Sequence, residues 1–191
     1  MSSPSATAKR AILQEAKGLQ ALSGKLGHDF DNAVESFASR RIIFLSGVGK
    51  SGHICRKLAA TMTSLGTKAV FIHPTEAAHG DMGLIGSDDA LLLFSRSGKA
   101  TEIYPLTDRA GILGLPTVLV SECDDDFLAT RVDHVIKIPK IAEAWGHAPT
   151  TSTVMQMAIG DAIAIALAEI KGYKWENFKT IHPGGALGNV A

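Results

Sequence analysis

Five short apolar segments alternate with helical patterns along this chain, and this alternation limits the folds that it can adopt. The segments span residues 42–45, 69–72, 90–94, 117–120 and 134–138. Apolar runs of four or five residues are typical of strands that are buried on both faces. Strands of this kind, separated by helices, predict an α/β fold of the Rossmann-like or flavodoxin-like type, with a five-stranded parallel sheet flanked by helices.

Helical patterns fill the gaps between these strands and also precede them. We expect helices over residues 51–65, 101–113 and 150–171, with a short one near 125–130. The 150–171 segment is apolar nearly all round, which indicates burial on more than one side, by a core and a subunit interface. Residues 6–23 and 30–39 predict two helices ahead of the sheet. We therefore divide the chain into a helical lead (1–40) and an α/β domain (41–191).

The composition is that of one globular domain. Of the 191 residues, 46% are hydrophobic and 20% are charged, and the net charge is zero. A balanced charge argues against nucleic-acid binding, which needs a basic stripe. No apolar run of 18 residues is free of polar breaks, so we expect no membrane span. The start of the chain does not resemble a signal peptide, and we expect a cytoplasmic protein with Cys55 and Cys123 reduced.

A glycine-rich turn, Gly-Val-Gly-Lys-Ser-Gly at residues 47–52, follows the first predicted strand. Such a turn at the start of a helix binds anions, because backbone N–H groups and the helix dipole point at one spot. A P-loop is excluded because Phe44 stands where that motif needs glycine. The turn satisfies G-x-G-x-x-G, but no acid ends the second strand to bind a ribose. A sugar phosphate, a dinucleotide and a turn without ligand remain open.

A second polar turn follows the third predicted strand. It offers the hydroxyls of Ser95 and Ser97, and a helix begins near Thr101. In a parallel sheet the carboxyl ends of the strands meet at one edge, where ligands bind. One phosphate held between this turn and Gly49–Ser51 explains both turns, so a sugar phosphate is the favoured ligand.

Three further polar positions lie in loops or turns. His79 belongs to a loop, residues 73–81, that suits a metal site or the polar wall of a pocket; it has no clear ligand spacing, and we expect no metal. Glu143 lies between the last strand and the apolar helix, where burial would raise the pKa of its carboxyl, as a general base requires. From the sequence alone, however, a solvated loop glutamate is favoured over a buried one. His182 lies in a Pro-Gly-Gly turn and is ambiguous by itself.

Several ordered motifs resemble those of a known family. They are Gly-Lys-Ser-Gly-His at 49–53, His-Pro-Thr-Glu-Ala-Ala-His-Gly-Asp at 73–81, Ser-x-Ser-Gly at 95–98, Ala-Pro-Thr-x-Ser-Thr at 148–153 and His-Pro-Gly-Gly-Ala-Leu-Gly at 182–188. Together they resemble the sugar isomerase (SIS) domain of D-arabinose-5-phosphate isomerases. The resemblance implies reversible conversion of D-ribulose 5-phosphate to D-arabinose 5-phosphate, the precursor of Kdo in lipopolysaccharide. It also implies a homotetramer with sites at subunit interfaces and no cofactor.

The resemblance also implies site residues. The functional positions fall on Lys50, Glu102, Glu143 and His182, with His79 lining the pocket and Ser51, Ser95 and Ser97 on the phosphate. An aldose–ketose isomerase, an intramolecular oxidoreductase, moves a proton between C1 and C2 through a cis-enediolate. We expect Glu143 to be the base, with Glu102 as the second choice. His182 would open the sugar ring, and Lys50 would neutralise the phosphate or the enediolate oxygen.

The chain departs from the family pattern at four places. Arg96 replaces the usual asparagine, and Lys99 and Ala100 replace Glu-Ser, so that Thr101 or Lys99 would substitute for a lost phosphate contact. The loop 143–149 is about two residues shorter than usual. The chain also resembles a stand-alone form without the CBS pair of longer members.

Two other functions stay open. One is a different SIS phosphosugar isomerase of the 3-hexulose-6-phosphate type, although the His-Pro-Gly-Gly-Ala-Leu-Gly ending argues against it. The other is a non-catalytic regulator that binds a sugar phosphate. Such regulators usually carry a helix-turn-helix ahead of the domain, and residues 1–40 have no basic recognition helix.

Overall fold

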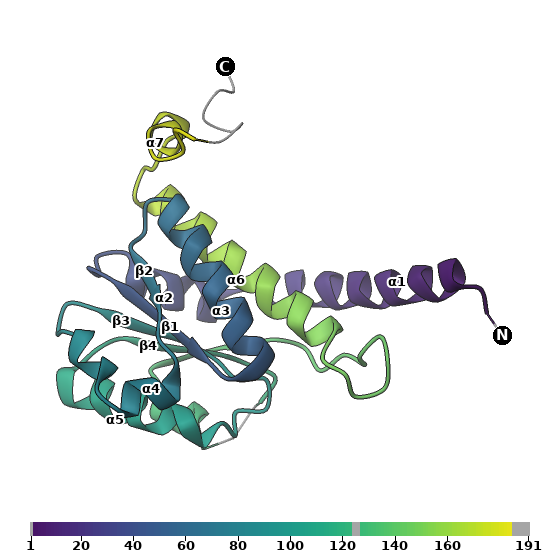
Figure 1. The fold of residues 1–191 in the computed structure, drawn as a ribbon, viewed down its shortest axis with the longest axis horizontal. Helices are drawn as coiled ribbons and strands as arrows, with labels where there is room; N and C mark the ends of the chain where they lie inside the picture. Colours follow the sequence, from purple (N-terminus) through teal and green to yellow (C-terminus); the bar gives the residue numbers. More distant parts are fainter. Residues whose placement is uncertain (1, 124–126, 185–191) are drawn as a thin grey trace.

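The structure is a computed structural model that describes residues 2–123 and 127–184 (Figure 1). Two sequence predictions fall partly outside these ranges. Residues 185–188 of the His-Pro-Gly-Gly-Ala-Leu-Gly motif lie outside the described residues. So do residues 125 and 126 of the short helix expected near 125–130; the described part holds a single 3₁₀ turn, Ala129–Arg131.

The five predicted strands form one parallel sheet, which confirms the predicted fold class. The strands are β1 (Ile43–Gly47), β2 (Ala69–Phe71), β3 (Ala90–Phe94), β4 (Thr117–Ser121) and β5 (His134–Lys137). They pair in parallel in the order β2-β1-β3-β4-β5. This is the flavodoxin-like order, and its topological switch point lies between β1 and β3.

The helices lie close to the predicted ranges. They are α1 (Pro4–Ser23), α2 (His28–Phe37), α3 (Gly49–Ser64), α4 (Pro74–Ala78), α5 (Tyr104–Leu113), α6 (Thr151–Ile170) and α7 (Trp175–Thr180). The short helices α4 and α7 were not predicted, because five or six residues are too few to show a helical period. The predicted helix 101–113 divides into a 3₁₀ turn, Thr101–Ile103, followed by α5.

Two apolar clusters cover the two faces of the sheet. Side chains alternate along a strand, so Ile43 and Leu45 point into one cluster and Phe44 into the other. The first cluster contains the apolar faces of α2, α3 and α6, and the second contains those of α4 and α5. Strands β1, β3 and β4 are buried along their whole length, as expected of a parallel sheet with helices on both faces.

Helix α6 is the longest apolar element of the domain. By length and composition it is, among the described residues, the one helix that could cross a membrane. Its Met155, Ile159, Ile163 and Leu167 are instead buried in the first cluster, against α3 and α1. Its Ile165 and Ile170 are about half exposed. The core therefore accounts for one apolar side of α6, and the other side is open.

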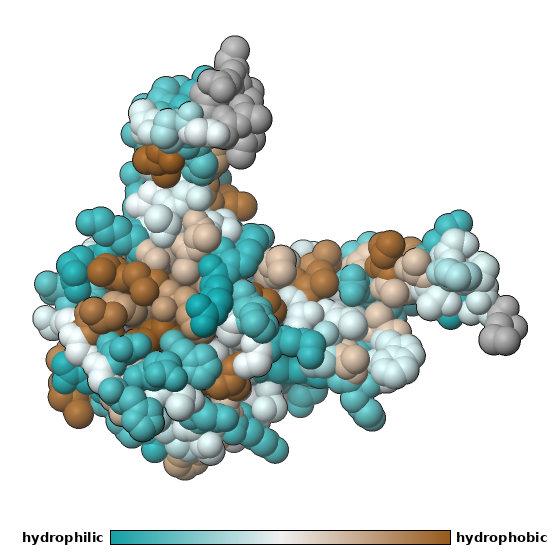
Figure 2. All heavy atoms as spheres, in the orientation of Figure 1, coloured by the Kyte–Doolittle hydropathy of each residue, from teal (hydrophilic) through white to brown (hydrophobic). Residues whose placement is uncertain are grey.

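Helix α1 extends away from the sheet (Figure 1). Only Gly18 and Leu22, near its end, are buried, and Gly18 lies against Thr151 and Met155 of α6. The projecting half exposes Ile12 and Leu13, both more than 60% accessible, and Figure 2 shows hydrophobic residues along this arm. Part of the helical lead thus packs on the domain, and part of it does not.

Candidate active site

The strand order brings the two predicted anion-binding turns to opposite sides of the switch point. The turn after β1 and the turn after β3 flank a small cavity of about 190 Å³. The start of α6 forms the third wall. The lining residues are Val48, Lys50, Ser51, Arg96, Pro149, Ser152, Thr153 and Gln156. Ligands of doubly wound proteins bind in such a crevice, so this cavity is the candidate site.

Glycines allow α3 to begin directly on the end of β1. Gly49 has a φ of +57°, a conformation that residues with a side chain rarely adopt. A Cβ on Gly52 would lie 2.7 Å from the carbonyl oxygen of Gly47, too close for any other residue. The glycines of this turn therefore let the N-terminus of α3 approach the strand, with its free N–H groups at the edge of the sheet.

The polar side chains of the first helical turn lie at the cavity. Lys50 is exposed, and its side chain lines the cavity. The hydroxyl of Ser51 donates to Oε1 of Gln156, 3.0 Å away, and so links α3 to α6. Gln156 is buried and did not emerge from the sequence. The sequence feature that could have indicated it is a polar residue within an otherwise apolar predicted helix.

The turn after β3 exposes most of its predicted ligand groups. Ser97, Thr101 and Glu102 are exposed, and Oγ of Ser97 accepts from the backbone N–H of Lys99 at 3.4 Å. Ser95, in contrast, is only 5% exposed. Of the three residues predicted to contact a phosphate from this turn, Ser97 and Thr101 are therefore open to a ligand and Ser95 is buried.

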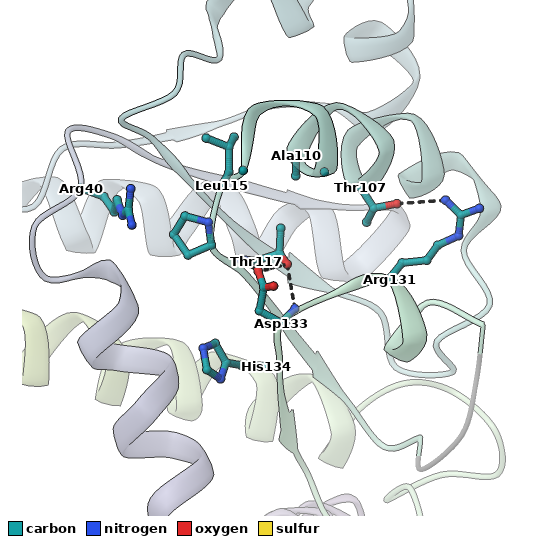
Figure 3. Close-up of a pocket in the computed structure, with 11 residues that line it drawn as sticks. Arg40, Thr107, Ala110, Leu115, Thr117, Arg131, Asp133 and His134 are labelled. Atoms are coloured by element: carbon teal, nitrogen blue, oxygen red, sulfur yellow. Dashed lines mark hydrogen bonds between the residues drawn. The ribbon is translucent and has the colours of Figure 1, made fainter.

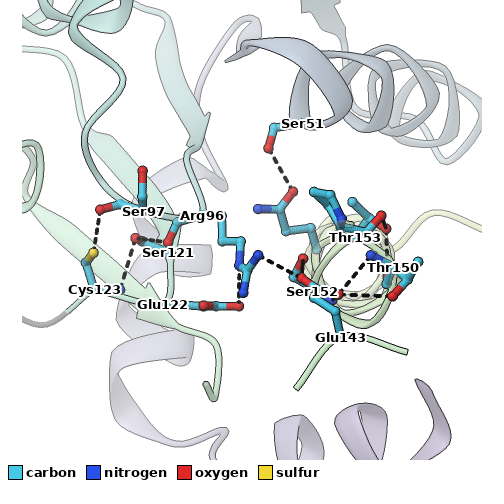
Figure 4. Close-up of polar contacts among 12 residues, drawn as sticks. Ser51, Arg96, Ser97, Ser121, Glu122, Cys123, Glu143, Thr150, Ser152 and Thr153 are labelled. Carbon is cyan, nitrogen blue, oxygen red and sulfur yellow. Dashed lines mark hydrogen bonds and ion pairs between the residues drawn. The ribbon is translucent and has the colours of Figure 1, made fainter. Parts of the chain in front are cut away.

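Glu143 is held by donors at the start of α6 (Figure 4). Its Oε2 accepts from the backbone N–H and the hydroxyl of Thr150 at 2.8 and 3.1 Å, and from the N–H of Ser152 at 3.2 Å. Its Oε1 accepts from the Ser152 hydroxyl at 2.5 Å and from Nη1 of Arg96 at 2.8 Å. The carboxylate therefore caps the N-terminus of α6, where free N–H groups and the helix dipole stabilise negative charge.

This environment corrects one expectation from the sequence. The Glu143 side chain is buried rather than solvated, with 3% of it exposed. Burial by itself raises the pKa of the carboxyl, but the hydrogen bonds from Ser152 and Thr150 and the charge of Arg96 outweigh it, and the pKa is lowered. The predicted raised pKa is therefore wrong, because the donors that stabilise the charged form were not visible in the loop sequence.

Arg96 joins two carboxylates at the edge of the cavity. Besides Nη1 on Glu143, its Nε lies 3.0 Å from Oε1 of Glu122, just after β4. Arg96 also lines a second cavity, of about 380 Å³. That cavity is further lined by Ser97, Lys99, Glu122, Cys123 and Lys140. Arg96 thus lines both cavities, and Figure 4 shows its side chain between Glu122 and Glu143.

The two predicted histidines lie elsewhere. His79 ends α4 and is exposed. His182 follows α7. Its ring stacks on the Phe178 ring, with the two ring centroids 3.9 Å apart, and its Nδ1 lies 2.9 Å from the Phe178 carbonyl oxygen. Helix α7 follows the far end of α6, a 20-residue helix of about 30 Å (Figure 1). Within one chain, the structure therefore does not bring His182 to the cavity at the start of α6.

A further cavity lies at the opposite edge of the sheet and is lined by none of the predicted site residues. It measures about 490 Å³ and is bordered by Arg40, Thr117, Arg131, Asp133 and His134, among others (Figure 3). Asp133 there accepts from the N–H and the hydroxyl of Thr117, both at 2.8 Å. These bonds tie the starts of β4 and β5 together, so we assign them to the fold. Within the described ranges, no group of three or more His, Cys, Asp or Glu could hold a metal ion.

Comparison with known proteins identifies the family. The SIS domain model matches residues 36–166. Arabinose 5-phosphate isomerase KdsD of Escherichia coli O6:H1 is 39% identical over 183 residues, which are 94% of this chain and 56% of that protein. The KdsD protein of Pseudomonas aeruginosa is 40% identical over 185 residues, 95% of this chain and 57% of its own. The chain thus spans little more than half the length of these relatives.

A solved structure matches over nearly the whole fold. The E. coli CFT073 protein solved in complex with arabinose 5-phosphate superposes with a TM-score of 0.85 at 35% sequence identity, covering 92% of this chain and 95% of its own. The motif resemblance, the matched model and this superposition agree, and the chain belongs to the SIS domain family.

Proposed function

We propose that this chain interconverts D-ribulose 5-phosphate and D-arabinose 5-phosphate through a cis-enediolate. The observation that carries the proposal is the cavity at the switch point, between two anion-binding turns, in a chain 35% identical to a protein solved with arabinose 5-phosphate. The KdsD relatives, named as arabinose 5-phosphate isomerases, support the same reaction. By this relation the product would supply Kdo synthesis in the cytoplasm.

The substrate phosphate is bound between the two turns. Ser97 and Thr101 offer exposed hydroxyls close in sequence to Arg96, which lines the cavity, and the N-terminus of α3 at the same cavity offers backbone N–H groups. Lys50, at the same cavity, neutralises the phosphate or the oxygen of the enediolate. Ser51 keeps its hydroxyl on Gln156, so its backbone N–H is the group that remains for the phosphate.

The base is better assigned to Glu102 than to Glu143. All five short contacts of Glu143 go to donors that stabilise its charge, and 3% of its side chain is exposed, so a substrate carbon has no open path to it. Glu102 is exposed beside the phosphate turn. A positioned base contributes about 10²- to 10⁴-fold to the rate. We therefore assign proton transfer between C1 and C2 to Glu102 and a positioning role to Glu143.

His182 reaches the site of another protomer in a homotetramer. The length of α6 separates His182 from its own cavity, and the open apolar side of α6 and the exposed residues of α1 offer surface for assembly. Co-expression of Glu102→Gln with His182→Ala tests this arrangement. Two inactive variants that regain activity together share a site between chains, whereas a complete lack of complementation contradicts it.

The reaction is tested in deuterated buffer by NMR. We expect arabinose 5-phosphate to yield ribulose 5-phosphate with deuterium at C1, and the reverse reaction to place deuterium at C2. Glu102→Gln should lower turnover about 10²-fold or more, whereas Glu169→Gln, an exposed glutamate at the far end of α6, should not. A folded protein that binds arabinose 5-phosphate without turnover, or that isomerises hexulose 6-phosphate instead, contradicts the proposal.

A further inference from the structure

Arg96 occupies an unusual position between two carboxylates. Its Nε lies 3.0 Å from Glu122, and its Nη1 lies 2.8 Å from Glu143. The two glutamates come from different segments, one after β4 and one before α6, and the arginine comes from the turn after β3. We propose that Arg96 is a positioning residue, which holds Glu143 on the start of α6 and so fixes the cavity wall that faces the substrate.

The burial of the three side chains supports this role. Glu143 and Glu122 are exposed over only 3% and 9% of their side chains, whereas Arg96 is 37% exposed. Two nearly buried carboxylates at one edge would repel each other without a cation between them. Lys50 lines the smaller cavity and Lys99 the larger one, and both are exposed. In the part of the chain that the structure describes, Arg96 is the cation that forms ion pairs with these two carboxylates.

The backbone of Arg96 gives its side chain a fixed origin. The Arg96 carbonyl oxygen accepts from the backbone N–H of Glu122 at 3.0 Å and from the hydroxyl of Ser121 at 3.2 Å. Both donors lie at the end of β4. The guanidinium therefore projects from a turn that is tied to the sheet, and it can hold Glu143 in place rather than follow it.

Only arginine fits both partners. Two different nitrogens of one planar guanidinium reach two carboxylates, a geometry that the single charged point of lysine does not reproduce. Asparagine, the usual residue of the family motif, is shorter and uncharged. The network of Arg96, Glu122 and Glu143 therefore acts on the cavity through Ser152 and the first turn of α6.

The direct test measures the Glu143 carboxyl itself. In protein labelled with ¹³C at the glutamate carboxyls, Glu143 is assigned with the Glu143→Gln variant and titrated by NMR. Arg96→Asn should raise the pKa of Glu143, and Arg96→Lys should raise it less. Arg131→Asn, which removes an arginine paired with Asp108 on the other side of the sheet, is the matched control and should leave it unchanged. An unchanged Glu143 titration in folded Arg96→Asn overturns the proposal.

The kinetic test rests on the proposed function. In Arg96→Asn we expect kcat/KM for arabinose 5-phosphate at pH 7 to fall about 10- to 100-fold, the effect of losing one charge-assisted hydrogen bond. The acid limb of its pH profile should also move to higher pH. If Arg96→Asn does not fold, Arg96→Lys carries the test. A wild-type protein without isomerase activity contradicts the proposed function, and the NMR titration then still decides the role of Arg96.

Discussion

Replacement of Glu143 by glutamine removes one negative charge and leaves the shape of the side chain. The amide oxygen can take the place of Oε2 and accept from Thr150 and Ser152, as the carboxylate does. The amide nitrogen then faces Nη1 of Arg96, and two donors meet. The substitution therefore breaks mainly the ion pair with Arg96 and weakens the cap of α6.

The cost follows from the burial of the pair. Breaking a fully buried ion pair costs about 3–5 kcal/mol. In the variant, Arg96 keeps Glu122 as a partner, and its side chain is 37% exposed. Both features reduce the penalty of leaving its charge without Glu143. A hydrogen bond to a charged group contributes about 1.5–3 kcal/mol. We therefore expect Glu143→Gln to lower the free energy of unfolding by about 2–3 kcal/mol at pH 7.

The effect should depend on pH with a definite sign. The pKa of Glu143 is lowered in the folded chain from its usual value of 4.5, so the folded state favours the charged form. Its contribution is complete above pH 4.5 and is lost as the pH falls through the lower folded pKa. The free energies of unfolding of the wild type and Glu143→Gln, measured in urea by circular dichroism, should differ by the full amount at pH 7 and by less near pH 3.5.

Asp108→Asn provides the matched control. Asp108 pairs with Arg131, but its side chain is 63% exposed, and such surface pairs contribute at most about 1 kcal/mol. This expectation is refuted if the free energy of unfolding of Glu143→Gln lies within about 0.5 kcal/mol of the wild-type value. It is also refuted if the difference between the two proteins stays constant between pH 7 and pH 3.5.

Three further experiments test the packing around the site. Gly52→Ala should destabilise the fold by about 1–3 kcal/mol and weaken phosphate binding, since its Cβ meets the carbonyl of the preceding turn; thermal melting with and without inorganic phosphate measures both. Gly160→Ala places a Cβ against the Leu58 side chain where α3 packs on α6, and it should lower the free energy of unfolding. Adding Leu58→Ala should relieve part of this loss, because the two side chains no longer collide. Additive losses in the double variant would contradict that contact. Burial raises the pKa of the Cys55 thiol, so Cys123→Ser protein should not react with a thiol reagent until it unfolds; rapid labelling in the native state would contradict this.

The fold could be predicted because its signals are local. Strand β3 is a run of five apolar residues, and the structure has it over the predicted residues. A parallel sheet buries both faces of such a strand, so composition alone identifies it. Helix α4, in contrast, has five residues and begins at Pro74. It packs against α5, and its own sequence is too short to show a helical period.

The site could be predicted only in part, because its chemistry depends on distant partners. The turn at Gly49 was visible from its spacing, and the structure places it at the switch point. The pKa of Glu143 depends on Arg96, 47 positions earlier in the chain, and on the N-terminus of α6. Sequence showed Arg96 only as a departure from a family pattern, since nothing local indicates which carboxylates it reaches.

The central claim is tested most directly by incubating the purified chain with arabinose 5-phosphate in deuterated buffer and identifying the product by NMR. Our account predicts ribulose 5-phosphate labelled with deuterium at C1, at a rate that Glu102→Gln lowers and Glu169→Gln does not. Unchanged arabinose 5-phosphate after incubation with a folded protein that binds it would contradict the account and indicate a sugar-phosphate-binding regulator.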